Sequence, residues 1–203
     1  MKRIAGIILA AGGSSRYGQP KQLLPWGNTN VINTTLRTAA LAGLEPVIVV
    51  LGAYESQITA TLTEANVQIV SNPDWQTGQS GSLKAGINVL PADCDGALFL
   101  LADQPHLSIH LVDALLREAE SGAVAVAPLI DGRRANPVYF SRAAFPLLNT
   151  ISGDQGGRAV MREVNVKYVD WYDEMQAHDI DEPEDYLVLK RFYFGEPDQP
   201  DKV

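Results

Sequence analysis

The stretch "IAGIILAAGGSSR", from Ile4 to Arg16, changes character halfway along. Its first part, Ile4 to Ala10, is a continuous apolar run. Such a run is typical of a strand covered on both faces, because a half-exposed strand would alternate apolar with polar residues. The second part consists of small residues followed by a cation, which favours an irregular loop. The stretch therefore predicts a buried strand that ends in a candidate ligand loop.

Apolar runs of the same kind recur along the chain and predict further buried strands. They lie at Pro46–Gly52, Val67–Val70, Gly96–Ala102 and Gly122–Pro128. Two intervening segments carry apolar residues at helical spacing, the first capped by Asn30 and ending at Gly43, the second capped by Ser108. Strands that alternate with helices predict a mainly parallel sheet with right-handed crossovers. We therefore expect an α/β fold: a single-domain, three-layer α/β/α, Rossmann-like architecture with a mostly parallel sheet.

The pattern becomes less regular after about residue 129. The segment "NPVYFS" predicts a strand that leads into a short helix, and "GDQGGRAVMREV" predicts a turn and a helix. The segment "DIDEPEDYLVLKRFY" predicts a capped final helix with Pro183 in its first turn. The last residues, 195–203, are polar and contain proline, so we expect a frayed tail after one domain at 1–194.

Composition excludes several classes of protein. The chain has 203 residues, 46% of them hydrophobic, and a formal net charge of -8, which argues against general nucleic-acid binding. The basic start and short apolar run resemble a signal peptide, but a buried first strand explains them better. No run approaches the roughly 18 apolar residues of a membrane span. A single cysteine, Cys94, suits a reducing compartment, so we expect a cytoplasmic protein with no membrane partner.

The loop after the first strand is the first candidate site. Backbone N–H groups of Gly12–Ser15 could line an anion-binding concavity, and Arg16 and Lys21 would add positive charge. The loop matches neither G-x-x-x-x-G-K-[ST] nor G-x-G-x-x-G. A surface turn of small residues is the alternative interpretation.

Two carboxylates form the second candidate site. Asp103 directly follows the run Gly96–Ala102, so it is expected at the carboxyl edge of the sheet, where ligands bind in such folds. Mg²⁺ favours one or two carboxylates together with substrate phosphates and water. An Asx-turn is the alternative for Asp103. Asp181 is the candidate second ligand, and its alternative role is to stabilise the start of the final helix.

The whole string "LAAGGSSRYGQPKQLLPWG", Leu9 to Gly27, closely resembles the opening signature L-A-[AG]-G-x-[SG]-x-R-x-G-x-x-K-x-L-L. That signature belongs to nucleotidyltransferases with a glycosyltransferase-A-like fold, and the nearest branch is the molybdenum cofactor cytidylyltransferase-like family. Five further motifs follow in the family's order: "NPDWQTGQSGSLKAG", "LLADQPHL", "ANPVYF", "GDQGGR" and "DIDEPEDY". The resemblance covers residues 4 to 188 and implies a nucleotide-diphospho-sugar transferase-like fold.

The resemblance also implies roles for particular residues. It places Lys21 and Arg16 in catalysis and Asp103 and Asp181 on Mg²⁺, and it favours Asp181 over Asp179 as the second metal ligand. Two departures from the family pattern are Ala135, where relatives often have Gly, and Glu182, where they usually have Thr. The implied nucleotide-binding residues are Leu9, Ala10, Ala11, Gly12, Gly13, Ser14, Ser15, Gly81 and Ser82, and the implied acceptor-binding residues are Asn136, Pro137, Asp154 and Gly156.

Several segments near these residues also permit ordinary structural interpretations. Gly81 and Ser82 stand just ahead of a helix expected to begin near Leu83, where a capped turn is the alternative. An ordinary turn likewise explains "GDQGGR", although Arg158 could meet an anion. Trp26 and Trp75 are expected to serve in packing, and because both lie near site loops they could also wall a pocket.

The implied reaction is transfer of CMP from CTP to the phosphate of the molybdenum-pterin cofactor, with release of pyrophosphate. Ala11 favours CTP, because relatives that use GTP tend to carry "LAGG" in place of "LAAG". A further implied partner is an apo-molybdoenzyme of the xanthine dehydrogenase type. Three alternatives remain: a GTP-dependent guanylyltransferase on the same cofactor, another small-molecule phosphate cytidylyl- or uridylyltransferase, and a non-catalytic accessory factor.

Overall fold

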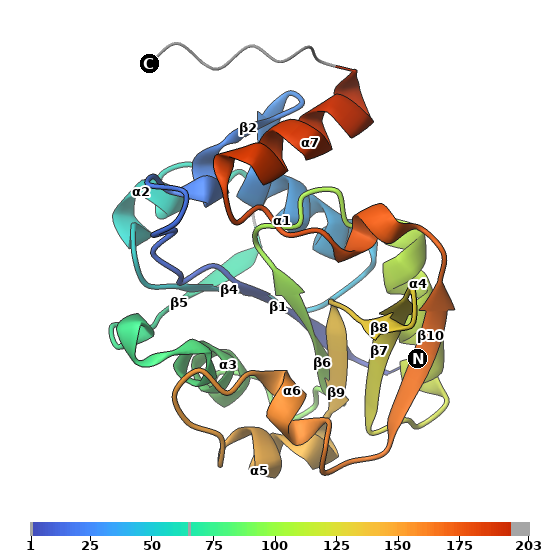
Figure 1. Cartoon of the computed structure of the whole chain (residues 1–203). Helices are drawn as coiled ribbons and strands as arrows, with labels where there is room; N and C mark the ends of the chain where they lie inside the picture. The colour runs from blue at the N-terminus through green and yellow to red at the C-terminus, as the bar shows by residue number, and fades with distance from the viewer. Residues whose placement is uncertain (1, 65, 196–203) are drawn as a thin grey trace.

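The apolar runs form the middle of one sheet in the computed structural model, which describes residues 2–64 and 66–195. The strand order is β10-β7-β9-β6-β1-β4-β5, with β8 paired to β7 (Figure 1). Neighbouring strands β6, β1, β4 and β5 pair in parallel. The strands predicted from the sequence are β1 (Ile4–Leu9), β4 (Val47–Leu51), β5 (Val67–Ser71), β6 (Gly96–Leu101), β7 (Ala125–Ile130) and β9 (Val138–Ser141).

Three features of the sheet differ from the sequence expectations. β9 runs antiparallel between β6 and β7. β5 is an edge strand whose residues are half-buried or exposed, so the expectation that both its faces are covered is wrong. β10 (Val166–Trp171) was not predicted, because it is also an edge strand and lacks a continuous apolar run.

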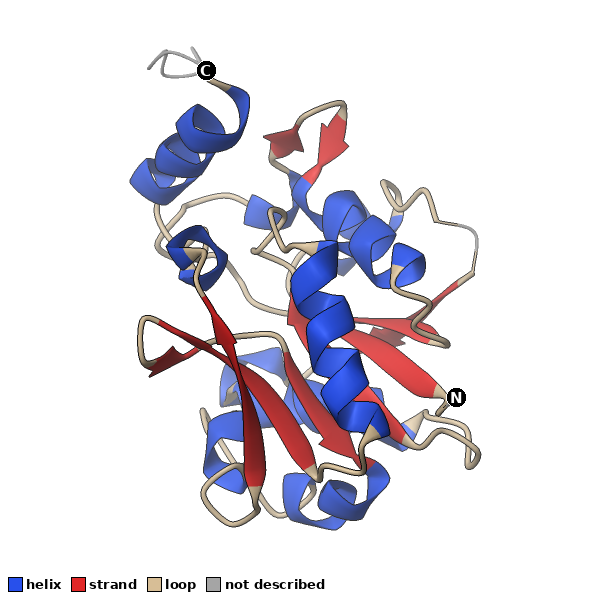
Figure 2. Cartoon of the chain, turned by 90° about the vertical axis from the view of Figure 1, so that its right-hand side faces the viewer, coloured by secondary structure: helices blue, strands red, loops and turns tan. Residues whose placement is uncertain are grey.

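Helices cover both faces of the sheet, which gives the predicted three layers (Figures 1 and 2). Successive residues of β1 point to opposite faces, as expected of a strand. Ile8 packs in one core cluster with Leu36 and Leu115, whereas Ile7 packs in another with Leu83. The first face carries α1 (Val31–Leu41), α2 (Glu55–Thr59) and α4 (Ile109–Glu120), and the second carries α3 (Gln79–Asn88), α5 (Phe145–Leu148) and α6 (Gly157–Val160).

The predicted caps of α1 and α4 are present. Asn30 accepts a hydrogen bond from the N–H of Asn33, and Ser108 accepts one from the N–H of His110. The expected start of α3 near Leu83 is wrong, because the helix begins at Gln79.

A final helix, α7 (Pro183–Phe194), lies beside the β2–β3 hairpin (Figure 1). Tyr186 and Leu189 pack there with Leu24, Trp26 and Val31 in a third core cluster. Residues 196–203 of the predicted frayed tail lie outside the described residues. The remaining elements are β2 (Pro25–Trp26), β3 (Thr29–Asn30), β8 (Arg133–Arg134), and the 3-10 helices η1 (Lys21–Leu23), η2 (Trp75–Thr77), η3 (Arg142–Ala144) and η4 (Glu174–Ala177).

Across the described ranges, no helix is both long enough and apolar enough to cross a lipid bilayer.

Candidate active site

The first loop is held in shape by one buried amide side chain, that of Gln22. Its Nε2 donates hydrogen bonds to the carbonyl oxygens of Ala10 and Gly12, each at 3.2 Å. The Ser14 hydroxyl lies 3.4 Å from Gln22 Oε1. Because Gln22 is only 2% exposed, these bonds are shielded from water. Sequence reasoning missed this residue, although a glutamine between Lys21 and a pair of leucines was a signal.

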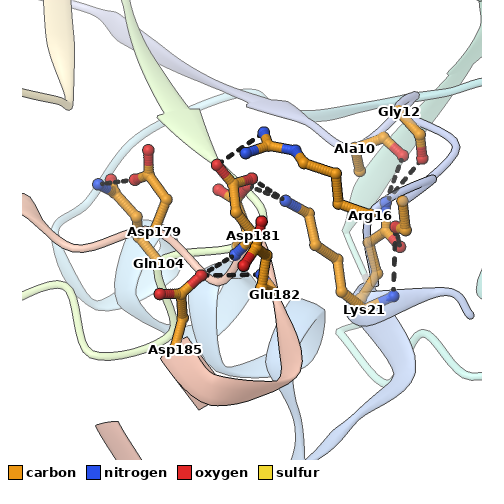
Figure 3. A network of polar contacts seen from close by, with 12 residues as sticks. Ala10, Gly12, Arg16, Lys21, Gln104, Asp179, Asp181, Glu182 and Asp185 are labelled. Atoms are coloured by element: carbon orange, nitrogen blue, oxygen red, sulfur yellow. Dashed lines mark hydrogen bonds and ion pairs between the residues drawn. The ribbon is translucent and has the colours of Figure 1, made fainter. Parts of the chain in front are cut away.

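Two cations of this loop meet two carboxylates from distant segments (Figure 3). Lys21 Nζ lies 2.6 Å from Asp103 Oδ2 and 3.1 Å from Asp181 Oδ1. Arg16 donates to Asp181 Oδ2 at 2.8 Å. Asp103 follows β6 and Asp181 precedes α7, so the sheet edge and the last helix bring both acids to the loop.

Neighbouring charges shift the pKa values of Lys21 and Asp181. Burial disfavours the charge of Lys21, whose side chain is 13% exposed, but Asp103 and Asp181 outweigh burial and raise its pKa. Burial likewise opposes ionisation of Asp181, but Lys21 and Arg16 outweigh it and lower its pKa. Lys21 and Asp181 are therefore both charged at neutral pH.

Asp181 is not the residue that caps α7. The N-cap is Glu182, which forms a capping box with Asp185. The Asp185 carboxylate accepts hydrogen bonds from the N–H groups of Asp181, at 3.0 Å, and Glu182, at 2.8 Å. The Asp181 carboxylate is therefore left to face the cations.

Asp179 lies close by but binds a different partner. It accepts a hydrogen bond from Gln104 Nε2 at 2.7 Å. Burial, followed by repulsion from Asp103 and Asp181, raises the pKa of Asp179 to about 7. The structure thus separates two acids that are only two positions apart: Asp181 pairs with Lys21 and Arg16, and Asp179 with an amide.

The loop and the carboxylates line a cavity of about 410 Å³. Trp75 and Gln79 form part of its wall. Gly13 packs against the Trp75 ring, from which an added Cβ would lie 2.7 Å away. Gly81 packs against the side chain of Asn72. Twelve predicted site residues line the cavity: Leu9, Ala10, Ala11, Gly12, Ser14, Ser15, Arg16, Lys21, Ser82, Asp103, Asp154 and Asp181.

A second cavity, of about 380 Å³, adjoins the first. The predicted residues Asn136, Asp154 and Gly156 line it, whereas Pro137 is buried and is not among the described residues that line it. The two cavities share Leu9, Gln79, Leu101 and Asp154. Molecules bound in the two cavities would therefore share these lining residues.

The second cavity is lined by both aromatic and cationic side chains. Phe99 and Phe140 are the aromatic ones, and Arg134, Arg158 and Arg162 are the cationic ones. Sequence reasoning singled out Arg158 only. Arg162 lies four positions further along the same segment, about one helical turn away, whereas Arg134 belongs to β8 and reaches this cavity only through the fold.

A family model described as a MobA-like NTP transferase domain matches residues 6–169 of the chain. The chain belongs to this family. The matched residues include most of the first strand, the first loop and Asp103. The predicted resemblance to molybdenum cofactor nucleotidyltransferases is therefore confirmed at the level of the family.

Curated relatives match this transferase domain over nearly its whole length. It is 31% identical to nicotine blue oxidoreductase of Paenarthrobacter nicotinovorans, over 92% of this chain and 96% of the relative. It is 31% identical to the purine catabolism protein PucB of Bacillus subtilis, over 93% and 96%. It is 29% identical to the molybdenum cofactor cytidylyltransferase of Escherichia coli, over 95% and 98%.

Solved structures share the fold of the transferase domain. One is the crystal structure of Rv0371c from Mycobacterium tuberculosis in complex with manganese. It is 26% identical, with a TM-score of 0.80, over 93% of this chain and 98% of that chain. The similarity agrees with the predicted fold class.

Proposed function

We propose that this transferase domain moves CMP from CTP to the phosphate of the molybdenum-pterin cofactor and releases pyrophosphate. The observation that carries the proposal is the convergence of Lys21, Arg16, Asp103 and Asp181 on one cavity that opens into a second. The name of the Escherichia coli relative supports the reaction. Other relatives are named as an oxidoreductase and a purine catabolism protein, so the site geometry bears the main weight.

The two acids suit a divalent cation, which we propose to be Mg²⁺. Asp103 and Asp181 provide carboxylate oxygens on one side of the cavity, and Asp103 Oδ1 is buried without a hydrogen-bond partner among the described residues. The described ranges contain no group of three or more histidine, cysteine or acidic side chains that could hold a metal. This fits an ion that takes two protein carboxylates and completes its shell with phosphate oxygens and water. When bound, the ion would neutralise phosphate charge.

The chain's own residues would align the reactants and balance charge. The N–H groups of residues 12–15 and Arg16 would hold the β- and γ-phosphates, and Lys21 would stabilise charge that develops on the α-phosphate. An oxygen of the acceptor phosphate forms a bond to the α-phosphorus, and the bond from that phosphorus to the bridging oxygen of the β-phosphate breaks. Pyrophosphate leaves, and CMP stays joined to the acceptor. A phosphate monoester is already a nucleophile at neutral pH, so no Ser-His-Asp group is needed.

The acceptor cavity also suits the proposed substrate. Its aromatic side chains, Phe99 and Phe140, would bind a flat ring system, and the arginines would bind anionic groups. Asp154 lines both cavities and so stands where acceptor and nucleotide would meet. An apo-molybdoenzyme of the xanthine dehydrogenase type would receive the product.

The deciding experiment incubates the purified chain with each NTP, Mg²⁺ and the molybdenum-pterin cofactor. We expect pyrophosphate release with CTP and a product that carries CMP. Equal or faster release with GTP would instead identify a guanylyltransferase. Tight binding to an apo-hydroxylase without pyrophosphate release from any NTP would identify an accessory factor. Release only with a different phosphorylated acceptor would replace the pterin substrate.

A further inference from the structure

The ammonium group of Lys21 contacts both carboxylates that the proposed metal would need. Lys21 Nζ lies 2.6 Å from Asp103 Oδ2 and 3.1 Å from Asp181 Oδ1. The side chains of Lys21 and Asp103 are largely shielded, with 13% and 17% of their surfaces exposed, and that of Asp181 is 35% exposed. Like charges repel strongly where water is excluded. A divalent cation on these oxygens would therefore have to displace the ammonium group.

The backbone at Lys21 is fixed, so only its side chain can move. Its N–H donates to Ser14 Oγ, and Lys21 begins the 3-10 helix η1. The next residue, Gln22, is tied to the carbonyl oxygens of Ala10 and Gly12. The flexible four-carbon stem of Lys21 thus starts beside the first loop and ends between the two carboxylates.

The same cavity offers the ammonium group a second place to bind. Lys21 and the backbone of Gly12, Ser14 and Ser15 line one cavity. A polyphosphate in that loop would carry several negative charges within reach of the lysine stem. Its oxygens would also complete the shell of a cation on Asp103 and Asp181. A bound nucleotide would therefore both release the carboxylates and add ligands for the cation.

We propose that Lys21 couples nucleotide and metal binding: it competes with a divalent cation for Asp103 and Asp181 until a polyphosphate draws it away. This inference rests on the proposed nucleotide site. The coupling is reciprocal, so the cation must strengthen nucleotide binding by the same factor. Arg16 contributes less to the competition, because within residues 2–64 and 66–195 it pairs with Asp181 and not with Asp103, and its side chain is 63% exposed.

The test measures the affinity of the full chain for Mn²⁺ by electron paramagnetic resonance of the free ion. Titrations are run without nucleotide and with α,β-methylene-CTP, and binding of Mn²⁺ to the analogue alone is subtracted. For the unaltered chain we expect the analogue to tighten Mn²⁺ binding at least about tenfold. For Lys21→Met we expect Mn²⁺ binding without the analogue to be at least about tenfold tighter than for the unaltered chain. Lys21→Arg, which keeps the charge, should restore weak binding.

A matched control removes a lysine from an ion pair outside the site. Lys167 pairs with Glu118 at 2.5 Å, and Lys167→Met should leave Mn²⁺ affinity unchanged. Thermal unfolding checks that each variant is folded, and Lys21→Gln replaces Lys21→Met if the latter is not.

Two results would overturn the coupling while leaving the proposed function intact. One is equal Mn²⁺ affinity with and without the analogue in a chain that releases pyrophosphate. The other is a charge-removing Lys21 variant that binds Mn²⁺ no more tightly than the unaltered chain. If the chain neither binds Mn²⁺ with the analogue nor releases pyrophosphate, the proposed function fails, and the coupling fails with it.

Discussion

The side chains of the neighbouring residues Lys21 and Gln22 point in different directions and bind different partners. The Gln22 side chain turns into the loop and binds backbone oxygens, whereas Lys21 reaches out to Asp103 and Asp181. The first loop can therefore be altered in two distinct ways, by removing its charge or by removing its internal support.

Removing the Lys21 charge should mainly affect turnover. We expect Lys21→Ala to lower kcat by about 10²–10³-fold, because a preorganised charge that meets the transition state is lost. The KM for CTP should change less. Pyrophosphate release measured at varied CTP checks this, with Lys167→Ala as the control. Normal turnover by Lys21→Ala would show that the lysine has no catalytic role.

Removing the Gln22 amide should loosen the loop. Gln22→Leu leaves the carbonyl oxygens of Ala10 and Gly12 without this donor, which should lower the free energy of unfolding by about 1–3 kcal/mol. Because the loop is the proposed phosphate site, the KM for CTP should rise more than kcat falls. Urea unfolding and steady-state kinetics provide the measurements. Gln57→Leu, an exposed change on α2, should stay within about 0.5 kcal/mol of the unaltered chain. An unchanged KM in folded Gln22→Leu would exclude the supporting role.

Among the elements, α3 contacts the loop at residues 153–156, and both contribute residues that line the two cavities. The N–H of Ser80, in the first turn of α3, donates to the carbonyl of Gly153 at 3.1 Å. Gly156 lies against Gln79, whose Oε1 would be 2.2 Å from an added Cβ. This docking places Asp154 at the boundary of the two cavities.

The start of α3 should be intolerant of a side chain at Gly78. Gly78 has φ +118, and an added Cβ would lie 2.2 Å from the carbonyl carbon of Gly153. We expect Gly78→Ala to lower the free energy of unfolding by more than about 2 kcal/mol and to raise the KM for the acceptor. The control is Gly122→Ala, where φ is +94 and nothing lies within 4 Å, so only about 1 kcal/mol of backbone strain is expected. Equal losses in urea unfolding of the two variants would refute the close contact.

At the scale of the whole molecule, the last helix, α7, packs against residues from the first part of the chain, among them Trp26. Tyr193 of α7 stacks 5.5 Å from His106, and Trp26 lies 6.3 Å from the same ring. Three segments far apart in the chain thus meet around one buried histidine. Ile180 also donates its N–H to the carbonyl of Asp103, which joins the segment before α7 to the end of β6.

His106 should make the folded molecule sensitive to acid. Burial lowers its pKa from 6.5 to about 4, and an interaction with the backbone of Met175 opposes this only in part. A lowered pKa means that the stability is present above pH 6.5 and is lost as the pH falls towards 4. From pH 7 to pH 5 the loss due to His106 should be about 2 kcal/mol.

His106→Phe should remove that part of the loss. The measurement is the free energy of unfolding at pH 7 and pH 5 for both chains. The raised pKa of Asp179 makes the folded state more stable as the pH falls, which opposes the effect of His106. Asp179 is present in both chains, so its contribution cancels when their pH dependences are compared. An identical pH dependence of the two chains would mean that His106 is not held neutral by burial.

Local sequence patterns determined the framework of this protein. Continuous apolar runs predicted the central strands, and Asn30 and Ser108 predicted the starts of two helices, because burial and capping depend on residues close together in the chain. The alternation of strand and helix placed the first loop and Asp103 at the same sheet edge. The ordered motifs then indicated the family, which the family model confirmed.

Only the tertiary structure decided which of these groups meet. Asp181 faces Lys21 from 160 positions away, whereas Asp179 turns to Gln104. The family resemblance favoured Asp181 over Asp179, but the residues around the two acids give no physical reason for that choice. The edge strand β10 was likewise not predicted, because half-exposed strands lack a continuous apolar run. The support of the loop by Gln22 and the joining of the two cavities also depend on side-chain directions set by packing between elements. Such contacts depend on the whole fold, because each one joins segments that come close in space only when the core has formed.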